Sequence, residues 1–150
     1  MRQINYDHVS AMRPEYTQNK GDCTEIIYEN GETYIAEKNI SSVINTMGKY
    51  YCTDLKANRK VYGKLLRIKN NVPIVFSDKH ILVPYKVRKP LNKRDGAYGY
   101  FNLYHLTGFE GKGKNAFIKL RNGIKLKLFQ NLKPYLKHIT LAERLFTEKR

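Results

Sequence analysis

The first half of the chain contains a stretch whose apolar residues recur every three or four positions, which is the spacing of one helical face. Residues 39–51 follow this pattern and begin with a polar cap that Asn39, Ser41 or Ser42 can supply. The pattern therefore predicts a core helix. Its apolar positions are Ile40, Val43, Ile44, Met47 and Tyr51.

A second helical pattern covers residues 56–69 and carries two stripes. Val61, Leu65 and Ile68 form an apolar stripe that is expected to face the core. Interior Gly63 costs the helix about 1 kcal/mol relative to alanine. The second stripe is basic, lies about a third of a turn away, and consists of Lys56, Lys60, Lys64 and Arg67.

Strand-like segments and turn residues surround the two helices. Residues 5–14 predict a first strand that Pro14 ends, and residues 15–22 predict a loop. Asn30-Gly31 lies between two β-prone runs within residues 24–37, and this pair predicts a hairpin with a two-residue type I′ turn. Further strands are expected at residues 72–77, 80–87 and 97–109.

The clearest alternation occurs in residues 116–129, where Asn122-Gly123 supplies a second two-residue turn. One face of this hairpin is expected to enter the core and the other to be cationic. The apolar positions are Ile118, Leu120, Ile124, Leu126 and Leu128, and the basic ones are Lys119, Arg121, Lys125 and Lys127.

A closing helix is predicted at residues 132–146, with Pro134 in its first turn. Its apolar side is expected to comprise Leu136, Ile139, Leu141 and Leu145. Segregated strands and helices indicate an α+β fold built from antiparallel β hairpins, two central helices and a C-terminal helix. A chain of 150 residues fits one domain with a substantial core, so residues 1–150 are expected to form a single domain.

Charge changes this picture most, because 28 basic and 13 acidic residues give a net charge of +15. The first 40 residues contain four basic and seven acidic residues, so the excess belongs to the rest of the chain. Between Lys56 and Arg94, twelve basic residues accompany a single acid, Asp78. Such a region of one sign is typical of a protein that binds a polyanion.

Three basic rows lie on different predicted scaffolds, and together they predict an extended surface for the phosphate backbone of double-stranded DNA. The loop arginines Arg88 and Arg94 are expected to enter a narrow A·T-rich minor groove, whereas the helix lysines suit phosphates. The helix row comprises Lys56, Arg59, Lys60, Lys64 and Arg67, the loop row Lys86, Arg88, Lys89, Lys93 and Arg94, and the hairpin row Lys119, Arg121, Lys125 and Lys127.

Catalytic, metal and cofactor sites are not predicted. The acidic residues after position 40 are scattered and form neither a Mg²⁺ pattern nor an acid-base pair. Residues 108–117 hold three glycines without the strand, G-K-[ST] and helix order of a phosphate-binding loop, so a polar hairpin loop is expected. Cys23 and Cys52 share no metal-ligand spacing with the histidines and are expected to be buried and inert.

Residues 1–10 lack the apolar segment of a signal peptide, and no run approaches a membrane span, so a cytoplasmic location is expected. Two alternatives to duplex DNA stay open. Twelve tyrosines and six phenylalanines, with residues 98–106 as a stacking platform, fit a sequence-tolerant nucleoid-associated or RNA-binding protein. The basic face also fits an interaction module for an acidic partner or an anionic membrane surface.

The order of these motifs resembles that of ComK-type competence transcription factors. Residues 44–76 resemble the middle of that family at Tyr50-Tyr51, Arg59-Lys60 and Val72-Pro73-Ile74. Residues 100–109 are similar to its Trp-Ile-Asn strand, with Tyr100 in place of the tryptophan and Asn102 retained, and residues 118–128 match its Asn-Gly hairpin. The resemblance extends from Tyr6 to Leu145.

The resemblance implies a bacterial transcriptional activator that switches on competence and DNA-uptake genes. Members of the family bind paired A·T-rich promoter boxes through the minor groove, generally as homo-oligomers, so a cytoplasmic protein associated with the nucleoid and without enzymatic activity or cofactor is expected. Longer members carry a C-terminal extension that takes part in activation and in recognition by the MecA adaptor of a Clp protease. Because this chain stops soon after the last predicted helix, proteolytic control by that route is not carried over. The missing tryptophan, together with Asn58 and Val72, indicates a divergent short paralogue.

Overall fold

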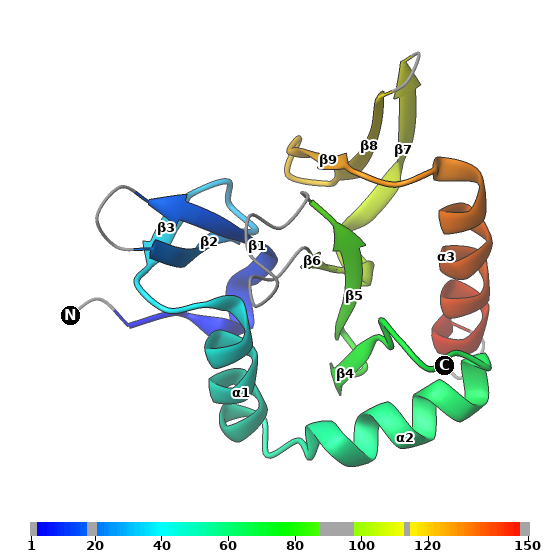
Figure 1. Ribbon diagram of the computed structural model, residues 1–150, viewed down its shortest axis with the longest axis horizontal. Helices are drawn as coiled ribbons and strands as arrows, with labels where there is room; N and C mark the ends of the chain where they lie inside the picture. Colours follow the sequence, from blue (N-terminus) through cyan, green and yellow to red (C-terminus); the bar gives the residue numbers. More distant parts are fainter. Residues whose placement is uncertain (1–2, 18–20, 88–97, 113–114, 148–150) are drawn as a thin grey trace.

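The structure, a computed structural model, describes residues 3–17, 21–87, 98–112 and 115–147. Within these residues the strands form a six-stranded antiparallel sheet in the order β3-β2-β1-β6-β5-β4 and a three-stranded sheet in the order β7-β8-β9 (Figure 1). The strands are β1 (Val9–Thr17), β2 (Gly21–Tyr28), β3 (Thr33–Ala36), β4 (Ile74–Ser77), β5 (His80–Lys86), β6 (Tyr98–Asn102), β7 (Leu106–Lys112), β8 (Asn115–Leu120) and β9 (Lys125–Leu128). The helices are α1 (Ile40–Tyr50), α2 (Leu55–Leu66) and α3 (Leu132–Thr147), with 3-10 turns η1 (Tyr6–His8) and η2 (Leu103–His105). The predicted α+β class is confirmed.

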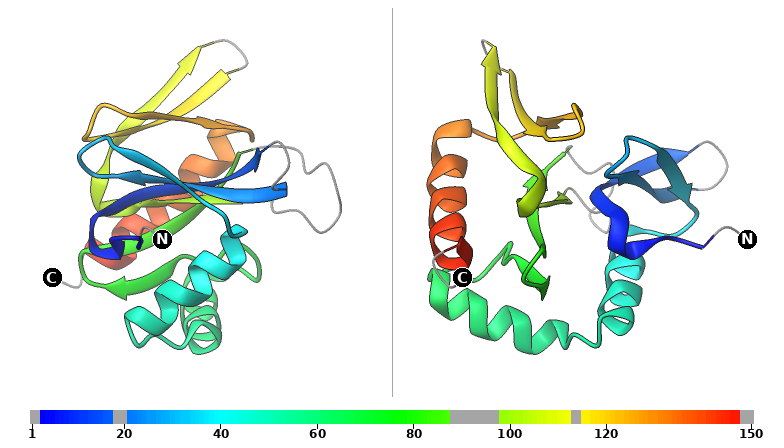
Figure 2. Two further views of the ribbon diagram at one scale, coloured as in Figure 1. Left: turned by 90° about the vertical axis from the view of Figure 1, so that its left-hand side faces the viewer. Right: turned by 180° about the vertical axis from the view of Figure 1, so that it is seen from behind.

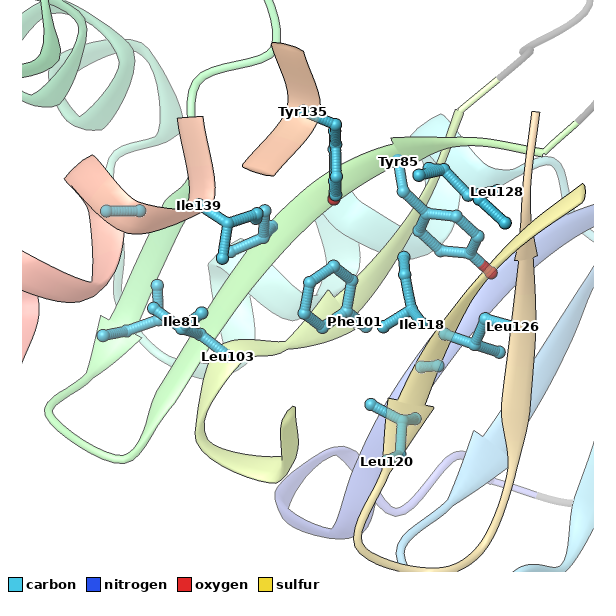
Figure 3. Packing of buried hydrophobic residues seen from close by; sticks show 14 of the residues in the cluster. Ile81, Tyr85, Phe101, Leu103, Ile118, Leu120, Leu126, Leu128, Tyr135 and Ile139 are labelled. Carbon is cyan, nitrogen blue, oxygen red and sulfur yellow. The ribbon is translucent and has the colours of Figure 1, made fainter. Parts of the chain in front are cut away.

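The six-stranded sheet separates two apolar clusters. On one face, α1 packs against strand residues that include Met12, Ile26 and Leu82. On the other face, α3 and the small sheet cover Phe101, which is fully buried among Ile118 and other apolar side chains (Figure 3). The core is therefore divided by the sheet, and α2 spans the space between α1 and α3 (Figures 1 and 2).

The first helix confirms its prediction in detail. Asn39 is the N-cap, because its side-chain oxygen accepts a hydrogen bond from the backbone N–H of Ser42 at 2.9 Å. Four of the five predicted apolar positions are buried and Tyr51 is half-buried. The helix 132–146 is confirmed too, but it turns Tyr135, Ile139 and Ala142 inward and leaves Leu141 exposed.

The prediction that Pro14 ends the first strand is wrong, since β1 continues to Thr17 and the expected loop at residues 15–22 is largely strand. Pro14 pairs with Thr24 of β2 on one side. On the other side, β6 pairs with β1 only at Ala11 and Met12. A proline is tolerated where one edge of a strand is unpaired, which explains why the strand survives it.

Both Asn-Gly hairpins form, but neither has the predicted two-residue type I′ turn. Gly31 has a φ of 92° and donates its backbone N–H to Tyr28 O at 2.9 Å, and Gly123 has a φ of 84° and donates to Leu120 O at 3.0 Å. The asparagines keep negative φ, and the side-chain oxygen of Asn122 accepts from the N–H of Ile124. Only the glycines are left-handed, which corresponds to a three-residue loop made of a type I turn and a glycine bulge.

The orientation predicted for the second helix is wrong. Val61 and Leu65 are 52% and 50% exposed, while Leu55, Asn58, Tyr62 and Leu66 face inward. Asn58 is the polar residue on this inward side, and it anchors the helix through two hydrogen bonds. Asn58 donates to Pro73 O and accepts from the N–H of Val75, both at 2.9 Å, and Tyr62 contacts the ring of Phe146.

Gly63 is required by the end of α2 rather than being a defect in it. Arg67 takes the left-handed conformation, with a φ of 58°, and Ile68 donates its N–H back to Gly63 O at 2.9 Å. A Cβ on residue 63 would lie 2.9 Å from Ile68 O, which leaves no room for alanine. Because the helix ends at Leu66, Ile68 leaves the predicted stripe and is half-buried.

Candidate nucleic-acid interface

The hairpin row behaves as the alternation predicts. Ile118, Leu120, Leu126 and Leu128 are buried and Ile124 is half-buried, whereas Lys119, Arg121, Lys125 and Lys127 are exposed. The cross-strand pair Lys119 and Lys125 places two cations side by side on the outer face. Lys125 Nζ lies 2.7 Å from Glu110 Oε2, so that charge is partly neutralised, and Lys127 Nζ lies 5.8 Å from the ring centroid of Phe129.

The helix row is exposed along its length. Lys56, Lys60 and Lys64 project from the outer side of α2, and no residue of this helix is acidic. Arg67 is also exposed, at the left-handed residue that ends the helix. Arg59 differs from the others, since it lines a groove together with Tyr98 and Tyr100 of β6.

The loop row lies mostly outside the described residues, because Arg88, Lys89, Lys93 and Arg94 fall within 88–97. The strands that lead into and out of this segment are described. Lys86 ends β5 and pairs with Tyr98, which begins β6. Lys86 donates its N–H to Gln130 Oε1 at 2.9 Å and accepts from the N–H of Phe129 at 2.7 Å, so this strand end is fixed against the residues that follow β9.

The three rows do not share one scaffold, and α2 and the β7-β8-β9 sheet lie at opposite ends of the molecule in every view (Figures 1 and 2). The strand ends at Lys86 and Tyr98 lie between α2 and the β7-β8-β9 sheet and contact residues on both sides. They contact the hairpin side through Phe129 and Gln130, and Tyr98 reaches the α2 side. The described residues Lys86 and Tyr98 therefore lie between the two basic regions.

A groove that the sequence pattern did not reveal lies on the α2 side, between α1, α2 and β6. Its volume is about 620 Å³, and its apolar floor includes Ile44 and Ile74. None of the described lining residues is acidic. Its polar lining includes Arg59, Lys69, Asn70, Asn71, Tyr98 and Tyr100.

Among the described residues, no acidic side chain compensates the positive charge of this groove. Within the described ranges, neither Arg59 nor Lys69 forms an ion pair. Burial raises the pKa of Tyr100, and the positive charge of Arg59 partly offsets that increase. Only the run of aromatic residues at 98–106 hinted at the groove, because β6 turns Tyr98 and Tyr100 to this side and Phe101 to the core.

A second polar cluster joins β1, η2 and the turn after β2, and its serine is inaccessible. Ser10 Oγ lies 2.8 Å from His105 Nδ1, and His105 Nε2 lies 3.6 Å from Glu29 Oε2. This order resembles that of a hydrolytic triad, yet Ser10 is fully buried within β1 and cannot meet a substrate. Cys23 is buried as predicted, whereas Cys52 is exposed, which corrects its expected burial. No metal-binding group of histidine, cysteine or acidic residues occurs in the described part of the chain.

The unfolding free energy should fall as the pH is lowered from 7 to 4, on the order of 1–3 kcal/mol. Burial lowers the pKa of His80 to about 4, and burial lowers the pKa of His105 as well. Folding therefore favours the neutral form of each histidine, while an unfolded histidine is protonated below about pH 6.5. Their stabilisation is complete above about pH 6.5, and the part due to His80 is lost as the pH falls towards 4.

Urea titrations at several pH values would measure this loss. Asp7 contributes separately at lower pH, because hydrogen bonds from Tyr50 and Tyr51 lower its pKa below the ordinary value of 3.8. His80→Gln should flatten the dependence between pH 6.5 and 4. An unchanged slope in that variant would show that His80 does not titrate in this range.

Comparison with known families gives one match, in which the family model described as ComK protein covers residues 5–135. Comparisons with curated proteins and with solved structures give no match. The part of the chain that the structure describes contains no helix with the length and apolar character of a membrane span. The match covers most of the chain and lies almost entirely within the range, Tyr6 to Leu145, over which the sequence resembles that family. The chain therefore belongs to the ComK family, a family of competence transcription factors and not of enzymes.

Proposed function

We propose that this protein activates competence genes by binding A·T-rich double-stranded DNA as a single domain. The observation that carries the proposal is the groove beside Tyr98, in which Arg59 and Lys69 have no acidic partner among the described residues. Unpaired cations that line a concave surface are suited to phosphate oxygens.

The groove that is proposed to bind phosphates adjoins the segment that is proposed to read the base sequence. Tyr98 is both a lining residue of the groove and the first residue after the segment 88–97. In the proposed complex, Arg59 and Lys69 hold the backbone on one side of that segment and Lys119 and Lys127 hold it on the other. Arg88 and Arg94 then reach into the minor groove between them, where an A·T tract has its deepest negative potential.

The family supports further parts of the proposal. Members that recognise paired boxes do so as homo-oligomers, and we propose the same for this chain, in the cytoplasm at the nucleoid. Lys86, Lys89, Lys93, Arg121 and Lys125 would add contacts to phosphates. Lys56, Lys60, Lys64 and Arg67 do not line the groove, so any phosphates that they contact lie outside it.

A salt titration with a labelled A·T-rich duplex tests the proposal. If roughly 6–10 phosphates are contacted, the logarithm of the binding constant should fall with the logarithm of salt concentration with a slope near −0.9 per phosphate. A slope shallower than about −3 would contradict the proposed interface. Unlabelled G·C duplex, single strand, RNA and anionic vesicles serve as competitors. A competitor that displaces the labelled A·T duplex as effectively as unlabelled A·T duplex does would indicate that the protein binds that class of ligand instead.

Arg59→Ala together with Lys69→Ala should weaken A·T and G·C duplexes equally and make the salt slope shallower by about 2, because phosphate contacts carry no sequence information. Lys137→Ala with Arg144→Ala is the matched control, since it removes the same two charge types from exposed positions of α3. Equal effects of the two double variants would mean that net charge alone governs binding and that the groove has no special part.

A further inference from the structure

The outer face of α2, defined here as Lys56, Lys60, Val61, Lys64 and Leu65, combines two features that seldom occur together on a free surface. Val61 and Leu65 are one helical turn apart and are 52% and 50% exposed. The remaining side chains of the face are exposed lysines. The face therefore offers a small apolar pair beside a row of positive charge.

Val61 and Leu65 are not needed for packing within the chain. Leu55, Tyr62 and Leu66 already supply the apolar side that α2 turns inward, and Asn58 fixes the helix to the Pro73 and Val75 backbone. Burying Val61 and Leu65 instead would require a rotation that breaks both bonds of Asn58. The helix is thus held with a second apolar side facing outward.

The chemistry of this face selects the class of partner. A binding helix is usually recognised through apolar anchors spaced one turn apart, as Val61 and Leu65 are. The lysine row attracts carboxylates. A second copy of the same face is disfavoured, because Lys60 and Lys64 would then oppose identical charges.

Duplex DNA matches only half of the face. Phosphates satisfy the lysines, but apart from the thymine methyl group the groove edges and the backbone present little apolar surface to cover branched side chains. A protein helix with a leucine stripe and glutamates beside it satisfies both halves at once.

We infer that the outer face of α2 is a docking surface for an acidic amphipathic helix of a partner protein. Apolar residues of that helix cover Val61 and Leu65, and its carboxylates face Lys56, Lys60 and Lys64. The surface is separate from the groove beside Tyr98, so the protein can bind this partner while it holds DNA.

The probe is a labelled synthetic helix in which leucines recur every three or four residues and glutamates fill the other positions, and binding is followed by fluorescence anisotropy at about 0.15 M salt. Its control is a scrambled peptide with the same composition and no stripe. The stripe peptide should bind the full chain at least about tenfold more tightly than the scrambled one, since two central apolar anchors are at stake.

Val61→Gln with Leu65→Gln should weaken binding of the stripe peptide by about tenfold or more. Glutamine is a good helix former, so the fold should survive, which circular dichroism checks. Lys60→Gln with Lys64→Gln should weaken binding too and reduce its dependence on salt. Leu141→Gln is the matched control, because it removes a leucine of similar exposure, 48%, from α3 and should leave peptide binding unchanged.

Three results would overturn the inference. Equal binding of the scrambled peptide would reduce the face to a general attractor of negative charge. An equal loss of A·T duplex affinity in the Val61→Gln, Leu65→Gln variant would assign the face to DNA. Dissociation of an oligomer in that variant, without peptide binding to the wild type, would assign it to a second copy. The peptide measurement needs no DNA, so its outcome is independent of the duplex experiments.

Discussion

Replacing Leu126 with alanine should lower the free energy of unfolding by about 2–5 kcal/mol, as measured by urea denaturation followed by circular dichroism. Leu126 is fully buried on β9, where it pairs with Ile118 and lies in the cluster that surrounds Phe101 (Figure 3). The expected loss combines the transfer of the missing methyl groups with the cavity left between the small sheet and the main sheet.

Lys127→Ala is the control for Leu126→Ala, because the two residues are neighbours on β9 and point to opposite faces. This exposed lysine should change the unfolding free energy by no more than about 0.5 kcal/mol. Lys125→Ala should also cost little, since its ion pair with Glu110 lies at the surface and such pairs contribute about 0–1 kcal/mol. If the lysine variants unfolded the protein and Leu126→Ala did not, the hairpin would be in a register shifted by one residue, which exchanges the two faces.

The hairpin and α1 were predictable because each has a single pattern that fits one orientation. From Ile118 to Leu120 and along β9, apolar residues alternate with lysines, so only one face can enter the core. In α1, the spacing of the apolar residues and the N-cap residue Asn39 predict the same start of the helix. Local sequence is therefore sufficient to predict these elements.

The second helix was not predictable in the same way because it carries two apolar sides. The stripe of Val61 and Leu65 is more conspicuous in the sequence than that of Leu55, Tyr62 and Leu66, yet the latter is turned inward. The inward choice depends on Asn58, whose amide satisfies backbone groups of Pro73 and Val75. A hydrogen bond to a segment that is distant along the chain leaves no periodic signal.

The groove beside Tyr98 escaped prediction for a related reason. Arg59 and Lys69 belong to the segment 56–69 that was predicted as one helix, but the helix ends between them at Leu66. Tyr98 reaches the same groove from a strand some thirty residues later. The hypothesis of one extended basic surface could not place these charges, because their arrangement follows from the tertiary fold.

Replacing Arg88 and Arg94 together with alanine should reduce the ratio of A·T to G·C duplex affinity by about tenfold or more, since each contact that depends on base sequence is worth about 1–3 kcal/mol. Lysine is a compact, strongly hydrated point charge that suits phosphates better than base edges, so the helix row is not expected to read sequence. Competition binding with both duplexes at one salt concentration measures the ratio directly.

Lys60→Ala with Lys64→Ala is the comparison for the loop variant, because it removes the same number of charges from the outer side of α2 and should leave the A·T preference intact. Netropsin, a minor-groove ligand, should displace the wild-type protein from an A·T duplex, whereas bulky groups on the major-groove edge should have little effect. If the loop variant kept its full preference while the lysine variant lost it, base reading would belong to α2, and the outer face of that helix would lie in the major groove. If the loop reads the base sequence instead, the two sets of variants should have separate effects. Changes at Arg88 and Arg94 should alter the preference for A·T over G·C duplex, whereas changes at the groove cations Arg59 and Lys69 should alter the affinity for both duplexes.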